Sequence, residues 1–406
     1  MPTTTYRTTA FVEAARRLQV DLTVASEKPS TFEETRPDGL LTLDFASLEW
    51  AVWKARRFAE RCPFDAALGV DDDTVVVAEA IDEAFGRARN PVAATLAARD
   101  KQLQRSLLHE ARVATPKFSL HVIGEHVDAV AESTRYPCIV KPLRMSASRG
   151  VIRADDPAQL AAAVGRLGAI LGSACDPETE GMLEYLVEDF VPGYEVALEG
   201  LLVGGELHAL ALFDKPDPLD GPFFEETIYV TPSRHPESEQ LALIDCARQA
   251  AAALGLREGP IHAELRFNER GAWLIELAAR PIGGRCSTVL RFGDGSVSLE
   301  EIVIRHALRL PLPSLLRERR AAAVMMIPVP GAGVLEGVAG IDEAKQVPGV
   351  DDVVITAHRG ETLVPWPEGS RYPGFIFARG ETPEQAERSV REAHRRLRFV
   401  VRPASA

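Results

Sequence analysis

Two glutamates, Glu264 and Glu276, have the spacing in this sequence that most directly suggests chemistry. Residues 269–271 between them, Glu-Arg-Gly, predict a hairpin with a three-residue loop whose glycine takes the left-handed position. That loop pairs Asn268 with Ala272 and sets Glu264 directly opposite Glu276. Two carboxylates that face each other on one side of a sheet repel unless a positive charge lies between them. A divalent cation that prefers oxygen ligands, Mg²⁺ or alternatively Mn²⁺, would supply that charge.

Strand alternation divides this hairpin into two faces. The core face is predicted to carry Ala263, Leu265, Phe267, Trp273, Ile275 and Leu277. The other face is predicted to carry His262, Glu264, Arg266, Leu274 and Glu276. The same alternation, continued past Glu276, places Arg280 on this second face. Its guanidinium could there stabilise a negatively charged intermediate. The structural alternative is that Arg266 neutralises the two glutamates as a salt bridge without any metal.

A lysine at a strand end is the second feature with a chemical interpretation. Residues 136–142, Tyr-Pro-Cys-Ile-Val-Lys-Pro, predict a buried strand that ends at Lys141, because the proline after it cannot continue the ladder. An ammonium in that place can hold nucleotide phosphates. A loop of small residues follows, with Ser146, Ser148 and Gly150, and lets backbone N–H groups approach phosphate oxygens. Taken alone, the lysine would point to water and the loop would be an ordinary hairpin tip.

An acidic segment, Leu186 to Glu195, is the third feature. It places Glu188 and Val191 before a Pro-Gly turn and Glu195 after it. Backbone groups of such a segment can meet the edge of a base, and the carboxylate of Glu195 can reach a ribose. A strand end whose acidic side chains are simply solvated is the alternative.

These features occur in the order seen in the ATP-grasp superfamily, which the chain resembles roughly from Lys101 to Leu310, after a preceding α/β domain. Residues 276–284, Glu-Leu-Ala-Ala-Arg-Pro-Ile-Gly-Gly, are similar to the L-amino-acid ligase subgroup. So are Pro328-Val-Pro330 and Pro367-Glu-Gly-Ser370 in the C-terminal region. The resemblance implies an ATP-dependent carboxylate–amine ligase that forms an amide or peptide bond through an acyl phosphate, with amino acids as substrates.

The resemblance also implies roles for individual residues. It assigns Mg-ATP to two lysines, the small-residue loop and the acidic segment: Lys101, Lys141, Ser146, Ser148, Gly150, Glu188, Val191 and Glu195. It assigns the metal to Glu264 and Glu276, and it makes Arg280 the catalytic residue that steadies the acyl phosphate.

Three further residues are implied to face the substrates. Glu226-Thr-Ile-Tyr229 occupies the place of the subgroup's Glu-x-x-His, so Glu226 would bind a substrate ammonium while Tyr229 replaces the histidine. Arg285 would pair with a substrate carboxylate. Surface positions are the alternative for both Glu226 and Arg285. Ala278 stands where many members have asparagine two residues after the second metal ligand, so one metal position would rely more on water or phosphate.

The order of the predicted helices and strands that position these residues indicates a multidomain chain of α/β and α+β class. Residues 1–92 are predicted to form a Rossmann-like pre-ATP-grasp domain with a parallel sheet covered on both faces. Its first strand is either missing before the helix Thr9–Leu18 or lies upstream of the given sequence. Phe64–Gly69 is predicted as a strand that ends in an acidic loop, Val70–Asp73.

The rest of the chain is predicted to form two further units. Residues 93–318 are expected to form the ATP-grasp fold, with a nucleotide-binding lid at about 115–190. The helical stretch Val92–Val113 connects it to the first domain. Residues 319–406 are expected to form a C-terminal α+β subdomain with a terminal helix.

Composition narrows the class of partners. The 406 residues carry a net charge of −13, which disfavours broad nucleic-acid binding because that needs a cationic surface. Neither a membrane span nor a secretory signal is predicted. Five cysteines without C-x-x-C spacing favour free thiols in the cytoplasm over disulfides or zinc. Small-molecule carboxylate and amine substrates are the expected partners. The sequence leaves open whether the protein forms a homodimer.

Two other functions remain open from the sequence. An ATP-grasp carboxylase of the biotin carboxylase or purine-pathway type would share the nucleotide residues and use bicarbonate, but the chain has no Met-Lys-Met biotin attachment site. A non-catalytic ATP-binding module is the other, and Ala278 and Tyr229 leave room for it. The presence of Arg280 argues against it, because binding ATP alone has little use for that side chain.

Overall fold

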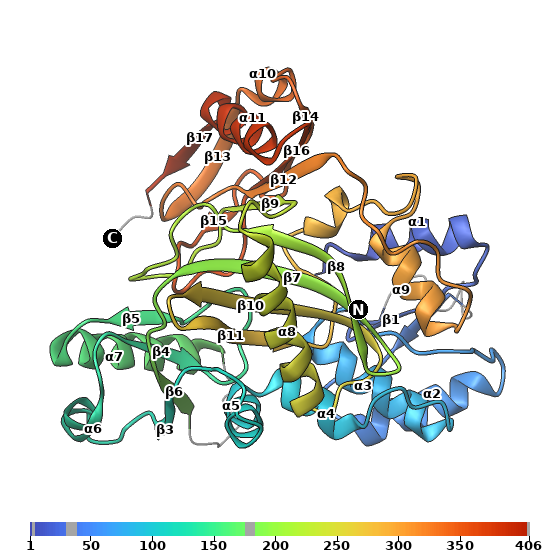
Figure 1. The fold of residues 1–406 in the computed structure, drawn as a ribbon, viewed down its shortest axis with the longest axis horizontal. Helices are drawn as coiled ribbons and strands as arrows, with labels where there is room; N and C mark the ends of the chain where they lie inside the picture. Colours follow the sequence, from blue (N-terminus) through green and yellow to red (C-terminus); the bar gives the residue numbers. More distant parts are fainter. Residues whose placement is uncertain (2–4, 30–38, 175–182, 404–406) are drawn as a thin grey trace.

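An eight-stranded antiparallel sheet is the centre of the molecule (Figure 1). The computed structural model describes residues 1, 5–29, 39–174 and 183–403. The strand order is β11-β10-β7-β8-β9-β12-β16-β14. The strands are β7 Tyr194–Val203, β8 Glu206–Asp214, β9 Ile228–Thr231, β10 Gly259–Asn268, β11 Gly271–Ala278, β12 Ala321–Met326, β14 Val350–Ile355 and β16 Gly374–Gly380. Because β9 pairs with β12, the sheet runs from the glutamate hairpin into the C-terminal region.

A smaller four-stranded sheet, in the order β3-β6-β4-β5, lies in the segment of about 115–190 predicted as the nucleotide-binding lid, and we call this region the lid. Its strands are β3 Phe118–Val122, β4 Cys138–Pro142, β5 Ile152–Ala154 and β6 Glu184–Asp189. Helices α6 Val127–Ser133 and α7 Pro157–Ala174 pack on it through Val130, Leu160 and Leu167. Strand β4 ends at Pro142, one residue beyond the predicted end, because Pro142 still pairs with Tyr185 of β6. Lys141 is therefore the last residue but one of a largely buried strand. Residues 175–182 of the predicted lid, with Cys175, lie outside the described residues.

The N-terminal region has less sheet than predicted. Its strands β1 Val24–Ser26 and β2 Leu40–Thr42 are parallel, and its helices are α1 Thr8–Leu18, α2 Leu48–Ala59 and α3 Asp72–Ala84. No described residue before Thr8 is in a strand. The strand predicted at Phe64–Gly69 is wrong. The Ala67 N–H donates to the Asp82 carboxylate at 3.0 Å, so a helix side chain takes the place of a neighbouring strand.

The predicted helical connection Val92–Val113 is two helices, α4 Val92–Arg99 and α5 Lys101–Glu110. They divide at Asp100, whose carboxylate accepts the backbone N–H groups of Gln102 and Leu103 at 3.0 and 3.1 Å. This is an N-cap, which satisfies amide groups that have no partner within the helix. The cap makes Lys101 the first residue of α5.

The glutamate hairpin has the predicted pairing but not the predicted turn. Asn268 pairs with Gly271, so the loop has two residues rather than three. A bulge between β10 and β11 then leaves Ile275 without a partner, and Glu264 faces Glu276 as expected. The predicted faces are wrong for part of β11, because Leu274 is buried in the core while Trp273 and Ile275 are only half-buried. A bulge places two residues opposite one and reverses the alternation on one side of it.

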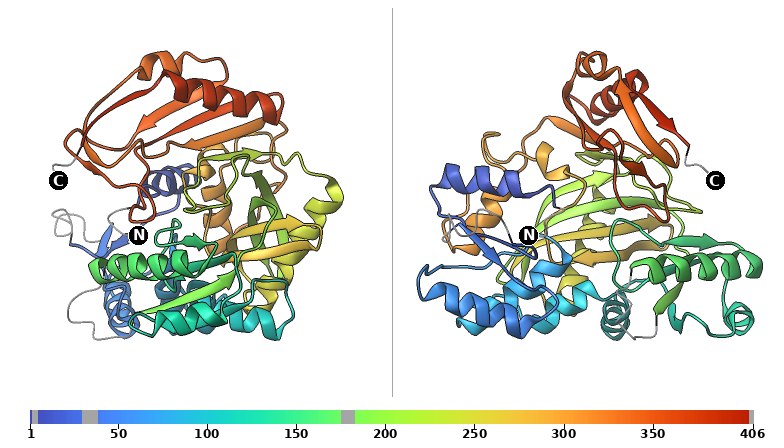
Figure 2. Two further views of the ribbon diagram at one scale, coloured as in Figure 1. Left: turned by 90° about the vertical axis from the view of Figure 1, so that its left-hand side faces the viewer. Right: turned by 180° about the vertical axis from the view of Figure 1, so that it is seen from behind.

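The remaining elements cover the sheets. Between the hairpin and β12 lie a 3₁₀ turn η1 Cys286–Val289 and α9 Leu299–Ala307, and α8 Glu237–Ala253 packs against β10 and β11. The C-terminal region adds α10 Ile341–Lys345, α11 Pro383–Arg396 and a three-stranded sheet of β13 Gly333–Ala339, β15 Thr362–Leu363 and β17 Arg398–Arg402. Figure 2 shows this region above the large sheet, with one of its loops reaching down toward the lid.

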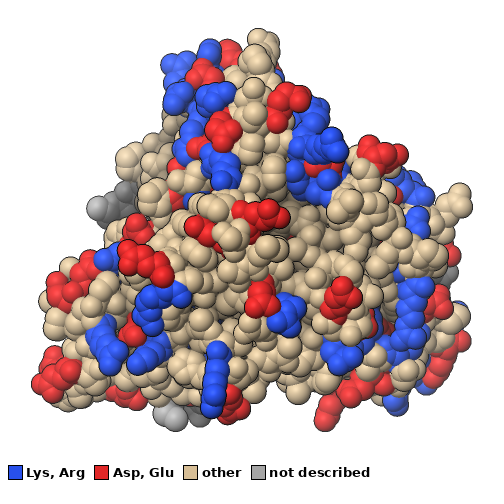
Figure 3. All heavy atoms as spheres, viewed as in Figure 1, with Lys and Arg blue, Asp and Glu red and all other residues tan. Residues whose placement is uncertain are grey.

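The surface charge, the helices and the cysteines give three further observations. Acidic and basic side chains are interspersed over the face seen in Figure 3. Among the described residues, no helix combines the length and the apolar character that crossing a bilayer requires. The thiols of Cys138, Cys246 and Cys286 are buried and unpaired.

Candidate active site

A group of cations lies where the lid meets the glutamate hairpin. Lys141 Nζ is 2.6 Å from Glu188 Oε2, and Arg105 Nε is 2.8 Å from Glu188 Oε1. Lys101 Nζ is 3.0 Å from Glu276 Oε1. Three cations therefore share two carboxylates, and we call these five residues the positive end of the site. Its excess of positive charge suits the phosphates of a nucleotide.

The protonation of the positive end follows from burial and from this excess charge. Burial lowers the pKa of the Lys141 ammonium from 10.5 to about 8, although Glu188 acts against the shift. Arg105 and Lys101 add to the lowering through their positive charges. Burial alone would raise the pKa of Glu276, but Lys101 and Lys141 outweigh it and lower the pKa. The pKa of Glu188 is lowered in the same way, with Arg105 and Lys141 outweighing burial.

The small-residue loop lies against the positive end. Lys101 Nζ donates to the carbonyl of Met145 at 2.9 Å, so the first lysine touches the start of the loop. Ala147 and Ser148 have left-handed backbones, with φ of 55° and 54°. Gly150 also has positive φ, and a Cβ there would meet Leu167 at 2.9 Å. The loop thus has the backbone turns that small residues allow, in the place where the sequence analysis expected phosphates.

The acidic segment has most of its polar groups engaged. The Glu188 side chain is held by Lys141 and Arg105, as described above. The carbonyl of Val191 accepts a hydrogen bond from Arg266 Nη1 at 2.8 Å. Glu195 is buried between Lys215 Nζ at 2.7 Å and Arg266 Nε at 2.9 Å. Contacts of this segment with adenine and ribose therefore stay a prediction that these side chains do not test.

A second group, which we call the negative end, surrounds Lys215. The Lys215 ammonium is 2.7 Å from Glu195, 2.5 Å from Glu226 and 3.6 Å from Glu264. One carboxylate oxygen from each of these three glutamates lies within 4.8 Å of the others. The hydroxyl of Tyr229 donates to Glu226 at 2.5 Å. The structure thus brings the predicted residues Glu195, Glu226, Glu264 and Tyr229 together.

Burial and mutual repulsion disfavour the charged forms of Glu226 and Glu264 at the negative end. Burial alone would lower the pKa of Lys215, but the three carboxylates around it raise the pKa well above 10.5. Burial raises the pKa of Glu264, and the charges of Glu195 and Glu276 add to the rise against the effect of Lys215. Burial also raises the pKa of Glu226, with Lys215 acting against it. These carboxylates therefore favour any additional cation.

The donor set of this region fits a divalent metal that prefers oxygen. Glu264 and Glu276 face each other across β10 and β11, and Glu264 shares its surroundings with Glu195 and Glu226. Carboxylate oxygens are the ligands that Mg²⁺ prefers. Arg266 is not the neutralising partner considered in the sequence analysis, because its nearest carboxylate is that of Glu195. The ammonium groups of Lys215 and Lys101 carry out that neutralisation instead.

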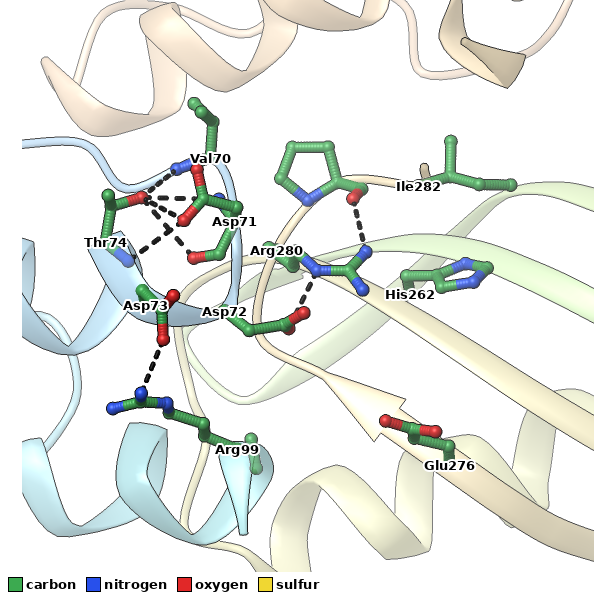
Figure 4. A network of polar contacts seen from close by, with 12 residues as sticks. Val70, Asp71, Asp72, Asp73, Thr74, Arg99, His262, Glu276, Arg280 and Ile282 are labelled. Carbon is green, nitrogen blue, oxygen red and sulfur yellow. Dashed lines mark hydrogen bonds and ion pairs between the residues drawn. The ribbon is translucent and has the colours of Figure 1, made fainter. Parts of the chain in front are cut away.

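Arg280 is half-buried near Glu276, on the residues that follow β11. Its Nε is 2.8 Å from Asp72 Oδ1, and this carboxylate raises the already high pKa of the guanidinium against the effect of burial. Figure 4 shows Arg280 between Asp72 at the start of α3 and His262 of β10, with Glu276 on the adjacent strand. Asp72 fixes the guanidinium so that one side of it is left facing the hairpin.

The structure does not bring Arg285 to this group. Its guanidinium lies over the rings of Phe375 and Phe377, 5.8 and 5.6 Å from their centroids. It lines a separate cavity of about 460 Å³ next to Arg291 and Arg379. Among the described residues no carboxylate lies within ion-pair distance of Arg285. Its contact with a substrate carboxylate stays a prediction.

Sequence reasoning missed three residues of the site. Lys215 had a usable signal, because it directly follows β8 and precedes a proline, as Lys141 precedes a proline at the end of β4. Arg105 had none, and Asp72 was noted only as part of the acidic loop Val70–Asp73. Their partners Glu188 and Arg280 are brought to them by tertiary packing.

Comparisons with known proteins bear on both halves of the molecule. Residues 134–289 match the ATP-grasp domain family, and residues 325–402 match the L-amino acid ligase C-terminal domain 2 family. The crystal structure of an L-amino acid ligase from Bacillus licheniformis superposes with a TM-score of 0.80 at 28% identity. That likeness covers 97% of this chain and 95% of the other.

Two curated relatives differ in how far they extend. The alanine–anticapsin ligase of Bacillus subtilis is 28% identical over 200 residues, which is 46% of this chain but 42% of that ligase. This chain therefore matches less than half the length of that enzyme. The uncharacterized protein y4rH of Sinorhizobium fredii is 23% identical over 399 residues, or 98% of this chain and 81% of that protein.

Proposed function

Because the chain belongs to the ATP-grasp superfamily and carries an L-amino acid ligase C-terminal domain, we propose that it joins a carboxylate to an amine at the expense of ATP. The bond formed is an amide or peptide bond, the intermediate is an acyl phosphate, and the substrates are amino acids. The proposal includes a cytoplasmic setting, since the buried thiols are unpaired and reducing compartments keep them so.

One observation carries the proposal: the site has a positive end and a negative end that meet at the Glu264–Glu276 hairpin. The positive end would hold the phosphates through Lys101 and Lys141. Mg²⁺ would be held where the two ends meet, through Glu264 of the negative end and Glu276 of the positive end. The negative end would hold a substrate ammonium through Glu226. When bound, Mg-ATP supplies the phosphoryl group and the positive charge that makes its transfer possible.

The reaction then follows from charge and geometry. A carboxylate oxygen of the first substrate attacks the γ-phosphorus, and the bond from that phosphorus to ADP breaks. The amine of the second substrate attacks the carbonyl carbon, and phosphate leaves with the carboxylate oxygen. Arg280, held by Asp72, would stabilise the negative charge that develops in both steps. Glu226 has a raised pKa and could take the proton that the attacking amine must lose.

The test is ADP release with Mg-ATP across pairwise mixtures of amino acids, followed by product masses. The expected result is ADP release that requires amino acids and an amide product whose mass equals two substrates less one water. Bicarbonate-dependent ADP release without any amino acid would replace the ligase with a carboxylase. ATP binding by calorimetry with no hydrolysis in any mixture would replace it with a non-catalytic binding module.

A further inference from the structure

A loop of the C-terminal region lies directly on the small-residue loop of the lid. The indole Nε1 of Trp366 donates to the carbonyl of Ala147 at 2.7 Å. The backbone N–H of Gly150 donates to the carbonyl of Pro367 at 2.9 Å. Trp366 and Ala147 are 219 positions apart in the chain, so two distant segments meet at the proposed phosphate site.

An ion pair at the edge of this contact repeats the connection. Glu368 accepts from Arg166 on helix α7 through both carboxylate oxygens, at 2.5 and 2.8 Å. The Arg166 guanidinium also lies 4.6 Å from the centre of the Phe223 ring. The backbone carbonyl of Glu368 accepts from Arg149 Nε at 3.0 Å. Both the loop and the main helix of the lid are therefore attached to residues 366–368.

The conformation of the lid loop needs such support. Ala147 and Ser148 both have left-handed backbones, which residues with a Cβ adopt rarely and only where the surroundings hold them. The Trp366 indole bonds the carbonyl of one of these residues, and its ring is buried with 4% exposure. A buried indole N–H that bonds a strained carbonyl is a specific contact and not chance surface packing.

The same loop reaches the other end of the site. The Trp366 ring packs against Tyr372, with ring centres 4.8 Å apart. The Tyr372 hydroxyl is buried and lies next to the backbone of Glu226. Burial and the nearby charge of Glu226 raise the pKa of this hydroxyl. Residues 366–372 thus extend from the lid loop to the negative end.

We propose that Trp366, supported by the Glu368–Arg166 pair, is a positioning residue that holds the lid loop over the γ-phosphate. The C-terminal region thereby takes part in closing the active site, although it supplies none of the metal or phosphate ligands. The inference rests on the proposed function, because the loop must cover a reactive acyl phosphate. Its consequence is protection: a loosened loop admits water, which captures the acyl phosphate before the amine does.

The first experiment compares the wild type with Trp366→Phe, which keeps a ring but removes the donor. The expected result is a KM for ATP about tenfold higher, as one lost hydrogen bond allows, with the KM for amino acids unchanged. The ratio of ADP released to amide formed rises above that of the wild type. The matched control is Trp53→Phe, whose ring is 49% exposed in the N-terminal region. An unchanged KM for ATP together with an unchanged ratio overturns the proposal.

The second experiment does not depend on ligase activity. Trypsin cleavage after Arg149, followed by mass spectrometry on the folded full chain, reports how firmly the lid loop is held. Arg166→Glu and Glu368→Arg should each accelerate this cleavage, and the double variant should restore the wild-type rate. Equal cleavage rates in all four proteins overturn the proposal even if the wild type proves inactive. Accelerated cleavage with rescue supports it even if the ligase assignment fails.

Discussion

Lys141 and Lys215 occupy the same local structure, yet the protein surrounds them with opposite charge. Each lies within one residue of a strand end and is followed by proline. Lys141 shares Glu188 with Arg105, whereas Lys215 is surrounded by Glu195, Glu226 and Glu264. Burial and neighbouring cations lower the pKa of the first lysine to about 8, and neighbouring carboxylates raise the pKa of the second well above 10.5.

This difference teaches that the local motif does not determine the role of the lysine. A buried ammonium with too few carboxylates gains by receiving an anion, so Lys141 is suited to a phosphate. Three partly buried carboxylates that share one ammonium gain by receiving a further cation, so the surroundings of Lys215 suit a metal or a substrate ammonium. Four predictions test this comparison.

The largest effect is expected where the two ends meet. Glu276→Ala removes a proposed metal ligand and the partner of Lys101, and should lower amine-dependent ADP release by about 1000-fold or more. The fold should stay intact, as measured by circular dichroism and thermal unfolding. Glu269→Ala, an exposed glutamate in the turn of the same hairpin, is the control and should stay active. Undiminished turnover in Glu276→Ala would refute the metal assignment.

Removing the central lysine of the negative end comes next. Lys215→Met leaves three partly buried carboxylates without their ammonium, and should cost about 3 kcal/mol in the free energy of unfolding measured in urea. Saturating Mg²⁺ or Mn²⁺ at about 100 times its Kd should return roughly 2.7 kcal/mol, because the metal replaces the lost charge. Lys141→Met should show no such rescue. Equal responses of the two variants to metal would remove the distinction between the two ends.

The positive end is expected to titrate. The lowered pKa of Lys141, about 8, means that its charge is present below that pH and is lost above it. The kcat/KM for ATP should therefore fall above pH 8, by up to about tenfold per pH unit. In Lys141→Arg this inflection should disappear, because arginine stays charged. An inflection that persists near pH 8 in the arginine variant belongs to another group.

The smallest effect is expected at Tyr229. Tyr229→Phe removes the hydroxyl that donates to Glu226 at 2.5 Å, and one lost hydrogen bond of this kind costs about 1 kcal/mol. The KM for the amino acid whose ammonium Glu226 is proposed to bind should rise by about fivefold. The KM for ATP should not change. A change in the KM for ATP alone would place Tyr229 at the wrong end of the site.

The glutamate pair was predictable even though the turn was not. Two shifts of one residue, in the loop and at Ile275, cancel by the time the strands reach Glu264 and Glu276. Strand alternation contains no signal for a bulge, so Leu274 was assigned to the wrong face. Helix α1 has strong periodicity and needed only local information, and its predicted bounds, Thr9–Leu18, differ by one residue from those of the structure.

Contacts between distant segments account for what the sequence did not reveal. Asp72 and Arg280 are 208 positions apart, and Trp366 and Ala147 are 219 apart. Their pairing depends on how whole sheets and helices pack, and not on residue types in a local window. Lys215 is the exception, because a lysine followed by proline at a strand end was the signal used for Lys141, and Lys215 has the same signal.

The acyl phosphate is the claim on which the account depends, and oxygen transfer tests it directly. An amino acid labelled with ¹⁸O in its carboxylate is incubated with Mg-ATP, the partner amine and the wild-type protein. Mass spectrometry of the released phosphate should show one ¹⁸O per phosphate, because the carboxylate oxygen bonds to phosphorus and leaves with it. Amide formation with unlabelled phosphate, or with the label in AMP, would contradict the account.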